Sequence, residues 1–257
     1  MTDWMQWLSK MEIIDLTVVL SEELPSYWPP VLGYKATPLY DIEHYGFFIR
    51  SLHVDEHAGT HFDAPAHFIP PEGSGLPHAG PASSITADKV PVQKMIGPAC
   101  VVDVRDLIGQ AGPGEHPAID LPRIKAWEVA HGSIQQDEIV IFHTGWTDLT
   151  YKPFPEGNKS MLDCVVLRKT PAWPQVTLEA MVYLAERGIR AAGTDGVSIG
   201  DFEAHRAGLR RGLVFVERLI NLARLPARGA LFVFLPIHVA GGSGAPGRAI
   251  AIIEAVQ

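Results

Sequence analysis

Three histidines and one aspartate lie within eleven positions of this chain, between His57 and His67. The segment reads His-Ala-Gly-Thr-His-Phe-Asp-Ala-Pro-Ala-His, and it contains no lysine or arginine that would repel a cation. Imidazole nitrogens and carboxylate oxygens are ligands that suit zinc or manganese. The spacing therefore predicts that His57, His61 and Asp63 converge on a divalent metal ion. His67 lies where it can add a ligand or move a proton.

The backbone of this segment is not expected to be helical, although a His-x-x-x-His pair can place two ligands one helical turn apart. Pro65 breaks a helix and also disfavours helical geometry at the residue before it. Gly59 relaxes the backbone between the two histidines. We therefore expect a strand end that leads into a tight turn. Position 58 is Ala, not the Glu of the zinc-protease pattern, so no protease is predicted.

A metal held by one short segment normally takes further ligands from elsewhere in the chain. The candidates are Asp195, which directly follows an expected strand, His205 and Glu217. Glu217 is a single carboxylate within a mainly apolar run, and such a group is costly to bury unless it is paired or ligating. Two interpretations stay open. Glu217 is either a metal ligand or the partner of Arg218 or Arg210 at a surface.

Aromatic residues flank the metal segment in the sequence. Among them, Trp28 and Phe47 are candidate substrate-binding residues, because aromatic side chains beside a metal suit a flat aryl substrate. Ordinary core packing is the competing interpretation for at least half of these aromatic residues.

The composition describes a globular chain. A length of 257 residues with 47% hydrophobic residues predicts one large domain spanning 1–257, and the 19% of charged residues argues against disorder. With a net charge of -8 and no basic stripe, nucleic acid is not an expected partner. The first ten residues lack the basic and continuous apolar regions expected of a signal peptide, and the longest apolar stretch is too short to span a bilayer. We expect a soluble cytoplasmic protein without membrane contact, acting on a small molecule.

Strands outnumber helices among the expected elements. A helix begins after Asp120, with Pro122 in its first turn, and ends before Gly132; a second begins after Thr177 and ends before Gly188. Residues 21–40 and 69–81 read as loops. Strands are expected at 13–20, 47–54, 100–104, 138–142, 189–194, 230–235 and 249–253. This pattern predicts a mixed α/β fold.

The segment from His57 to Phe68 resembles the signature of the cyclase-like metal-dependent hydrolases, the family of bacterial kynurenine formamidase and isatin hydrolase. The resemblance extends through residues 142–146, 193–198, 204–205, 216–222 and 241–248, and so covers nearly the whole chain. It implies a swivelling β/β/α domain that forms a homodimer or a higher homo-oligomer.

The resemblance also implies a ligand set. In formamidase-like members, two metal ions are held by residues that match His57, His61, Asp63, His67, His205 and Glu217, with Asp63 and Glu217 between the ions. In isatin-hydrolase-like members a single manganese is typical and the glutamate is not kept. Glu217 follows His205 at the formamidase-like spacing. The chain is longer than a typical bacterial kynurenine formamidase, and the segment 124–132 resembles the corresponding helix of isatin hydrolase.

The implied activity is hydrolysis of a C–N amide bond in an aryl formamide or a cyclic amide. Water activated by the metal would attack the carbonyl, and His67 would pass a proton to the leaving nitrogen. The alternatives are isatin-hydrolase-like ring opening and lactone hydrolysis or cyclisation. A catalytically silent metal-binding scaffold is the alternative from another class. Such a scaffold would not need His67 or Glu217.

Overall fold

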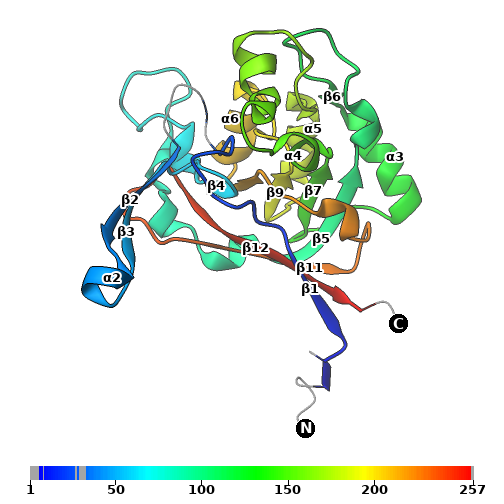
Figure 1. Ribbon diagram of the computed structural model, residues 1–257. Coiled ribbons are helices and arrows are strands. Elements are labelled where there is room, and N and C mark those ends of the chain that lie inside the picture. Colours follow the sequence, from blue (N-terminus) through cyan, green and yellow to red (C-terminus); the bar gives the residue numbers. More distant parts are fainter. Residues whose placement is uncertain (1–5, 8, 27, 29–32, 256–257) are drawn as a thin grey trace.

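The computed structural model describes residues 6–7, 9–26, 28 and 33–255. Its main sheet has eight strands in the order β1-β12-β11-β5-β7-β9-β10-β4 (Figure 1). The short strand β4 pairs with β12 as well as with β10, so seven strands close into a ring, and β1 joins it on β12. The strands are β1 Met11–Asp15, β4 His61–Asp63, β5 Ile96–Asp103, β7 Ile139–His143, β9 Ala191–Thr194, β10 Phe215–Glu217, β11 Ala230–Pro236 and β12 Gly244–Glu254. This mixed α/β architecture was predicted; the swivelling arrangement stays a prediction.

The side chains of the central strands point alternately to two hydrophobic cores. Strands β5, β7, β9 and β10 run parallel, and β7 is buried along its whole length, as expected for a parallel strand covered on both faces. Val140 and Phe142 pack in the core beneath the helices. Ile139 and Ile141 pack in a second core with Phe62, from β4, on the other face of the sheet.

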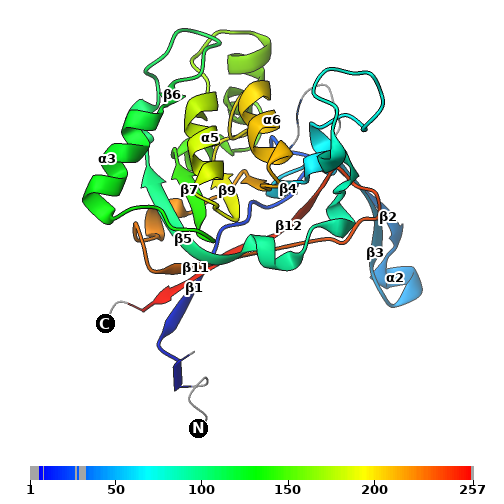
Figure 2. The same cartoon turned by 180° about the vertical axis from the view of Figure 1, so that it is seen from behind.

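Helices α3 to α6 gather on one side of the ring (Figures 1 and 2). They are α3 Leu121–His131, α4 Trp146–Thr150, α5 Leu178–Glu186 and α6 Phe202–Arg210. The two predicted helices are confirmed: the side chains of Asp120 and Thr177 cap α3 and α5, and Gly132 follows α3 with φ 88°. Helix α6, capped by Asp201, was not predicted. No helix in the described residues is both long and apolar enough to cross a membrane.

A hairpin projects from the body of the molecule (Figure 2). It consists of β2 Tyr34–Tyr40, α2 Ile42–Tyr45 and β3 Ile49–Val54. Within the described part of the chain, β2 and β3 pair only with each other. We call it the arm. The prediction of a loop at 21–40 is wrong for the residues of β2, whose ladder tolerates Pro38 beside a register shift.

Shorter elements complete the fold. Strands β6 Ala118–Ile119 and β8 Gln175–Val176 form a second small sheet. The described residues also form short 3-10 helices, which are η1 Pro65–His67, η2 Pro81–Ser84, η3 Ala87–Lys89, η4 Val92–Met95, η5 Arg105–Leu107, η6 Glu156–Ser160 and η8 Leu222–Arg224, and one π-helix, η7 Leu162–Val166.

Candidate metal centre

Strand β4 positions two of the predicted ligands. Side chains alternate along a strand, so His61 and Asp63 share one face while Phe62 turns to the core against Phe234. In the antiparallel pairing with β10, His61 lies opposite Glu217. The strand register therefore brings a carboxylate from a distant part of the sequence beside the histidine and aspartate of β4.

The turn before β4 brings in His57. Its backbone N–H donates to Asp55, and Gly59 has a positive φ of 62°. At this φ any side chain would be strained, and a Cβ at position 59 would also lie 2.5 Å from Leu20 Cδ2, so the turn favours glycine. The expected strand end that leads into a tight turn is confirmed, because β4 ends at Asp63 and the 3-10 helix Pro65–His67 follows it.

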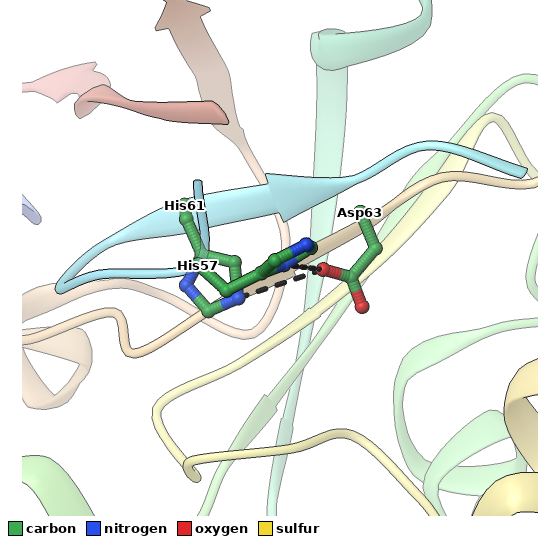
Figure 3. Close-up of side chains that lie close together, drawn as sticks. All are labelled: His57, His61 and Asp63. Carbon is green, nitrogen blue, oxygen red and sulfur yellow. Dashed lines mark hydrogen bonds and ion pairs between the residues drawn. The ribbon is translucent and has the colours of Figure 1, made fainter. Parts of the chain in front are cut away.

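His57, His61 and Asp63 form the first group of converging ligand atoms (Figure 3). The distance from His57 Nδ1 to Asp63 Oδ1 is 2.8 Å, and His61 Nε2 lies 3.5 Å from the same oxygen. The side chain of Asp63 is 2% exposed.

A second group consists of Asp63, His205 and Glu217. His205, on α6, places Nε2 3.2 Å from Glu217 Oε1 and 3.6 Å from Asp63 Oδ2. The other oxygen of Glu217 lies 3.6 Å from His61 Nε2. Glu217 is buried and faces histidines, so its interpretation as a surface ion-pair partner of an arginine is wrong.

The charges at this site compensate one another. Burial raises the pKa of Asp63, but the imidazoles of His67, His205 and His57 outweigh it and hold that pKa well below its usual value. Burial likewise opposes protonation of His205, yet hydrogen bonds to Asp63 and Glu217 raise its pKa to about 10. The carboxylates thus keep protons on neighbouring imidazoles, in the place that a bound cation would take.

The donor set fits a metal because of how His61 and His205 use the ring nitrogen that points away from the site. His61 Nδ1 lies 2.9 Å from the carbonyl oxygen of Gly59, and His205 Nδ1 lies 3.0 Å from that of Asp201. A carbonyl only accepts, so both histidines donate through Nδ1 and turn Nε2 to the site. Histidines that bind metals normally hold their second N–H in this way.

His67 lies beside these groups but belongs to neither. Its ring stacks on that of His57, with centroids 3.9 Å apart and 26° between the planes. Burial outweighs the opposing charge of Asp63 and lowers the pKa of His67 to about 4. A neutral imidazole next to the predicted metal suits proton transfer; the role of His67 as a ligand stays a prediction.

A cavity of about 580 Å³ opens over the two groups. Trp28 lines it, as expected for a substrate-binding residue. Its ring packs edge-on against that of Trp173, with 6.2 Å between the ring centroids. Phe47 does not line it and lies on the arm, 48% exposed. Two aromatic residues not singled out from the sequence, Phe68 and Phe202, line the cavity as well. Phe68 follows His67 directly, and that adjacency was its only signal.

Asp195, a candidate metal ligand in the sequence, forms hydrogen bonds to the backbone and side chain of a turn instead. Its carboxylate accepts hydrogen bonds of 2.6 Å from the N–H and hydroxyl of Thr144 and from the N–H of Gly145. Burial outweighs these bonds and raises its pKa to about 7. Asp195 therefore anchors the turn after β7 and is not a member of the two groups that share Asp63.

Comparisons with known proteins identify the family of this chain. The family model Cyclase, described as "Putative cyclase", matches residues 14–201. An isatin hydrolase of Roseibium aggregatum is 31% identical over 261 residues, which cover 95% of this chain and 92% of the relative. A kynurenine formamidase of Salinibacter ruber is 29% identical over 207 residues, which cover 79% and 78% of the two chains.

Solved structures show the same fold. Isatin hydrolase A from Labrenzia aggregata, bound to benzyl benzoate, has a TM-score of 0.79 and 26% identity, and the match covers 99% of this chain and 100% of that one. An isatin hydrolase bound to the product analogue thioisatinate has a TM-score of 0.78 with 26% identity over the same shares. From the match over most of its length, the chain belongs to the cyclase family.

Proposed function

We propose that this protein is a metal-dependent hydrolase that cleaves a C–N amide bond in an aryl formamide or a cyclic amide. The observation that carries the proposal is the pair of ligand groups that share Asp63 at an aromatic-lined cavity. The relatives named isatin hydrolase and kynurenine formamidase support the same reaction type.

The proposed cofactor is zinc or manganese. His57, His61 and Asp63 would hold one ion, and His205 and Glu217 would hold a second ion together with Asp63. A divalent cation there supplies a water of lowered pKa at neutral pH and polarises a carbonyl group.

The remaining chemistry belongs to the side chains around the cavity. His67 is neutral at pH 7 and can accept a proton and pass it to the leaving nitrogen. Trp28, Phe68 and Phe202 form apolar walls that would pack against an aryl ring and exclude water. The cavity volume of about 580 Å³ suits a small molecule.

A second candidate is ring opening of isatin or of a related lactam or lactone. The 31% identity with an isatin hydrolase over 95% of this chain favours it. Both candidates need the same carbonyl chemistry, so the substrate alone distinguishes them. A silent metal-binding scaffold would bind the ion and turn over neither.

The test is a substrate panel on protein that has been stripped with a chelator and reloaded with zinc or manganese. We expect activity on an aryl formamide, isatin or an aryl lactone to return with the metal. Asp63→Ala should lose most bound metal and the activity, because Asp63 belongs to both ligand groups. Asp106→Ala, which removes an exposed ion pair with Arg123, is the matched control.

Three results separate the possibilities. Turnover of the formamide supports the first proposal, and turnover of isatin or the lactone alone supports the second. Metal binding without turnover of any substrate supports the scaffold. Full activity of Asp63→Ala after exhaustive chelation would contradict the assignment of the site.

A further inference from the structure

We propose that Glu56 and Ser243 form a hydrogen-bonded relay behind His57. This relay fixes which ring nitrogen His57 turns to Asp63, and so helps to set how tightly the site retains a cation. The inference rests on the metal binding proposed above. It concerns two residues that touch neither ligand group except through His57.

The relay is a continuous chain of short contacts. His57 Nε2 lies 2.9 Å from Ser243 Oγ, which in turn lies 2.6 Å from Glu56 Oε2. The backbone N–H of Ser243 donates to the same carboxylate oxygen at 2.9 Å. On its other side, His57 Nδ1 lies 2.8 Å from Asp63 Oδ1.

The direction of each hydrogen bond in the relay follows from the carboxylate of Glu56, at which the relay ends. An ionised carboxylate only accepts, so the single hydroxyl proton of Ser243 goes to Glu56. Ser243 Oγ must then accept from His57, and Nε2 carries that proton. Nδ1 is left facing Asp63, and two acceptors at this distance need a proton or a cation between them. The relay therefore prepares Nδ1 of His57 as the ligand atom.

Two glycines make room for the relay. A Cβ at Gly242 would lie 2.8 Å from Glu56 Oε1, and a Cβ at Gly244 would lie 2.7 Å from His57 Cε1 and 2.3 Å from the carbonyl oxygen of Phe62. The Gly-Ser-Gly sequence thus lets one hydroxyl approach both partners while its neighbours carry no side chain. This packing gives a role to the segment 241–248, which belongs to the family resemblance but contributes no residue to the two ligand groups.

The backbone fixes Ser243 relative to the ligands. Its carbonyl accepts from the N–H of Ala64 at 2.9 Å, and Gly244 is paired with Asp63 where β12 meets β4. The hydroxyl is therefore held by the same strand that carries two ligands.

His57 differs in this respect from the other two histidines. His61 and His205 donate to neutral backbone carbonyls, whereas His57 donates through a hydroxyl to a charged carboxylate. Hydrogen bonds to charged groups are stronger than neutral ones. Groups that orient a ligating histidine typically change metal affinity by about 10- to 100-fold when they are removed.

The test compares Ser243→Ala, Glu56→Gln and the double variant by chelator competition with zinc or manganese. We expect Ser243→Ala to bind the metal about 10- to 100-fold more weakly than the parent. Because Glu56 acts through Ser243, the double variant should be no weaker than Ser243→Ala alone.

The matched control is Thr86→Val. Thr86 donates its hydroxyl to Asp88 at 2.7 Å, and Asp88 accepts from the N–H of Gly241 at 2.9 Å. It is the same kind of hydroxyl–carboxylate pair, packed against the loop that carries Ser243 through the bond to Gly241, and no hydrogen bond among the described residues joins it to His57. We expect parental metal affinity in this variant.

A second readout needs no metal. Nitrogen-15 NMR of the chelated protein should show a protonated Nε2 at His57, and a proton exchanging faster with solvent in Ser243→Ala. The relay is wrong if Ser243→Ala and Glu56→Gln bind metal like Thr86→Val, or if their effects on binding simply add. Should the parent bind no metal at all, the proposed function fails, and the NMR measurement still decides whether the relay exists. If Ser243→Ala does not fold, Glu56→Gln carries both measurements.

Discussion

His67 is held differently from the other histidines at the cavity. Among the described residues, its ring has no hydrogen-bond partner and is oriented by stacking on His57 and by an edge contact with Phe68. A ring oriented in this way can turn between a water and a leaving group more easily than one pinned by an outer hydrogen bond. This freedom favours a proton carrier over a tightly bound ligand.

We expect His67→Gln to lower kcat by about 10²- to 10⁴-fold, the usual contribution of a positioned acid or base. Bound metal, measured by elemental analysis, should stay within error of the parent. His116→Gln is the control, because His116 also lines the cavity but donates through Nδ1 to the backbone carbonyl oxygen of Trp173. Loss of metal in His67→Gln would show instead that His67 is a ligand.

Strand β4 is only three residues long, yet it joins both ligand groups. Its pairing with β10 sets Glu217 opposite His61, and its pairing with β12 brings in Ser243. Glu217 Oε1 also accepts from the N–H of Ile199 at 2.8 Å. The two oxygens of Glu217 therefore face histidines of different groups, as a carboxylate between two ions would.

Glu217→Gln should lower the metal bound at saturation from two ions per chain to one. The neutral amide keeps an acceptor for Ile199 but loses the charge that two cations require. Titration with calorimetric or spectroscopic detection gives the number, and thermal unfolding checks that the fold is retained. One ion per chain in the parent, unchanged in the variant, would instead favour a single-metal site.

The predictability of each element depended on how local its signals are. Helix α3 could be predicted because its cap, its first-turn proline and its final glycine all lie within one short stretch of the sequence. Helix α6 could not, because Gly208 weakens its helical pattern. The structure explains that glycine: a Cβ there would lie 2.5 Å from Phe215 Cζ.

The same distinction holds for the site. His57, His61 and Asp63 were predicted from spacing because one segment carries all three. His205 and Glu217 were expected from the resemblance, since only the register of β4 with β10 and the packing of α6 bring them there. The contact of Ser243 with His57 spans 186 positions, and no local pattern indicates it.

The arm gives the molecule an exposed apolar surface outside the cavity. Ile42, Tyr45, Phe48 and Leu52 are each more than half exposed. A two-stranded hairpin on its own is marginally stable in water, so burial of this surface against a partner would stabilise the arm. The expected homodimer would supply it through a self-complementary contact, the commonest kind in soluble oligomers.

Ile42→Lys combined with Phe48→Lys should shift the protein from dimer to monomer, because two charges would have to be buried in the contact. Light scattering coupled to size-exclusion chromatography measures the mass. Val129→Lys is the control, since Val129 is 89% exposed on α3, away from the arm. A monomeric parent would refute the dimer, and an unchanged dimer in the double variant would exclude the arm as its contact.

Closure of the ring by β4 has a consequence for the life of the protein in a cell. The strand that completes the sheet also carries two of the proposed ligands, so an ion held by Asp63 on β4 and Glu217 on β10 would hold these two strands together at this seam. An ion at 100 times its dissociation constant stabilises the folded chain by about 2.7 kcal/mol. Metal starvation would then not only silence the protein but also open its seam to proteases, so its abundance would follow the supply of the metal.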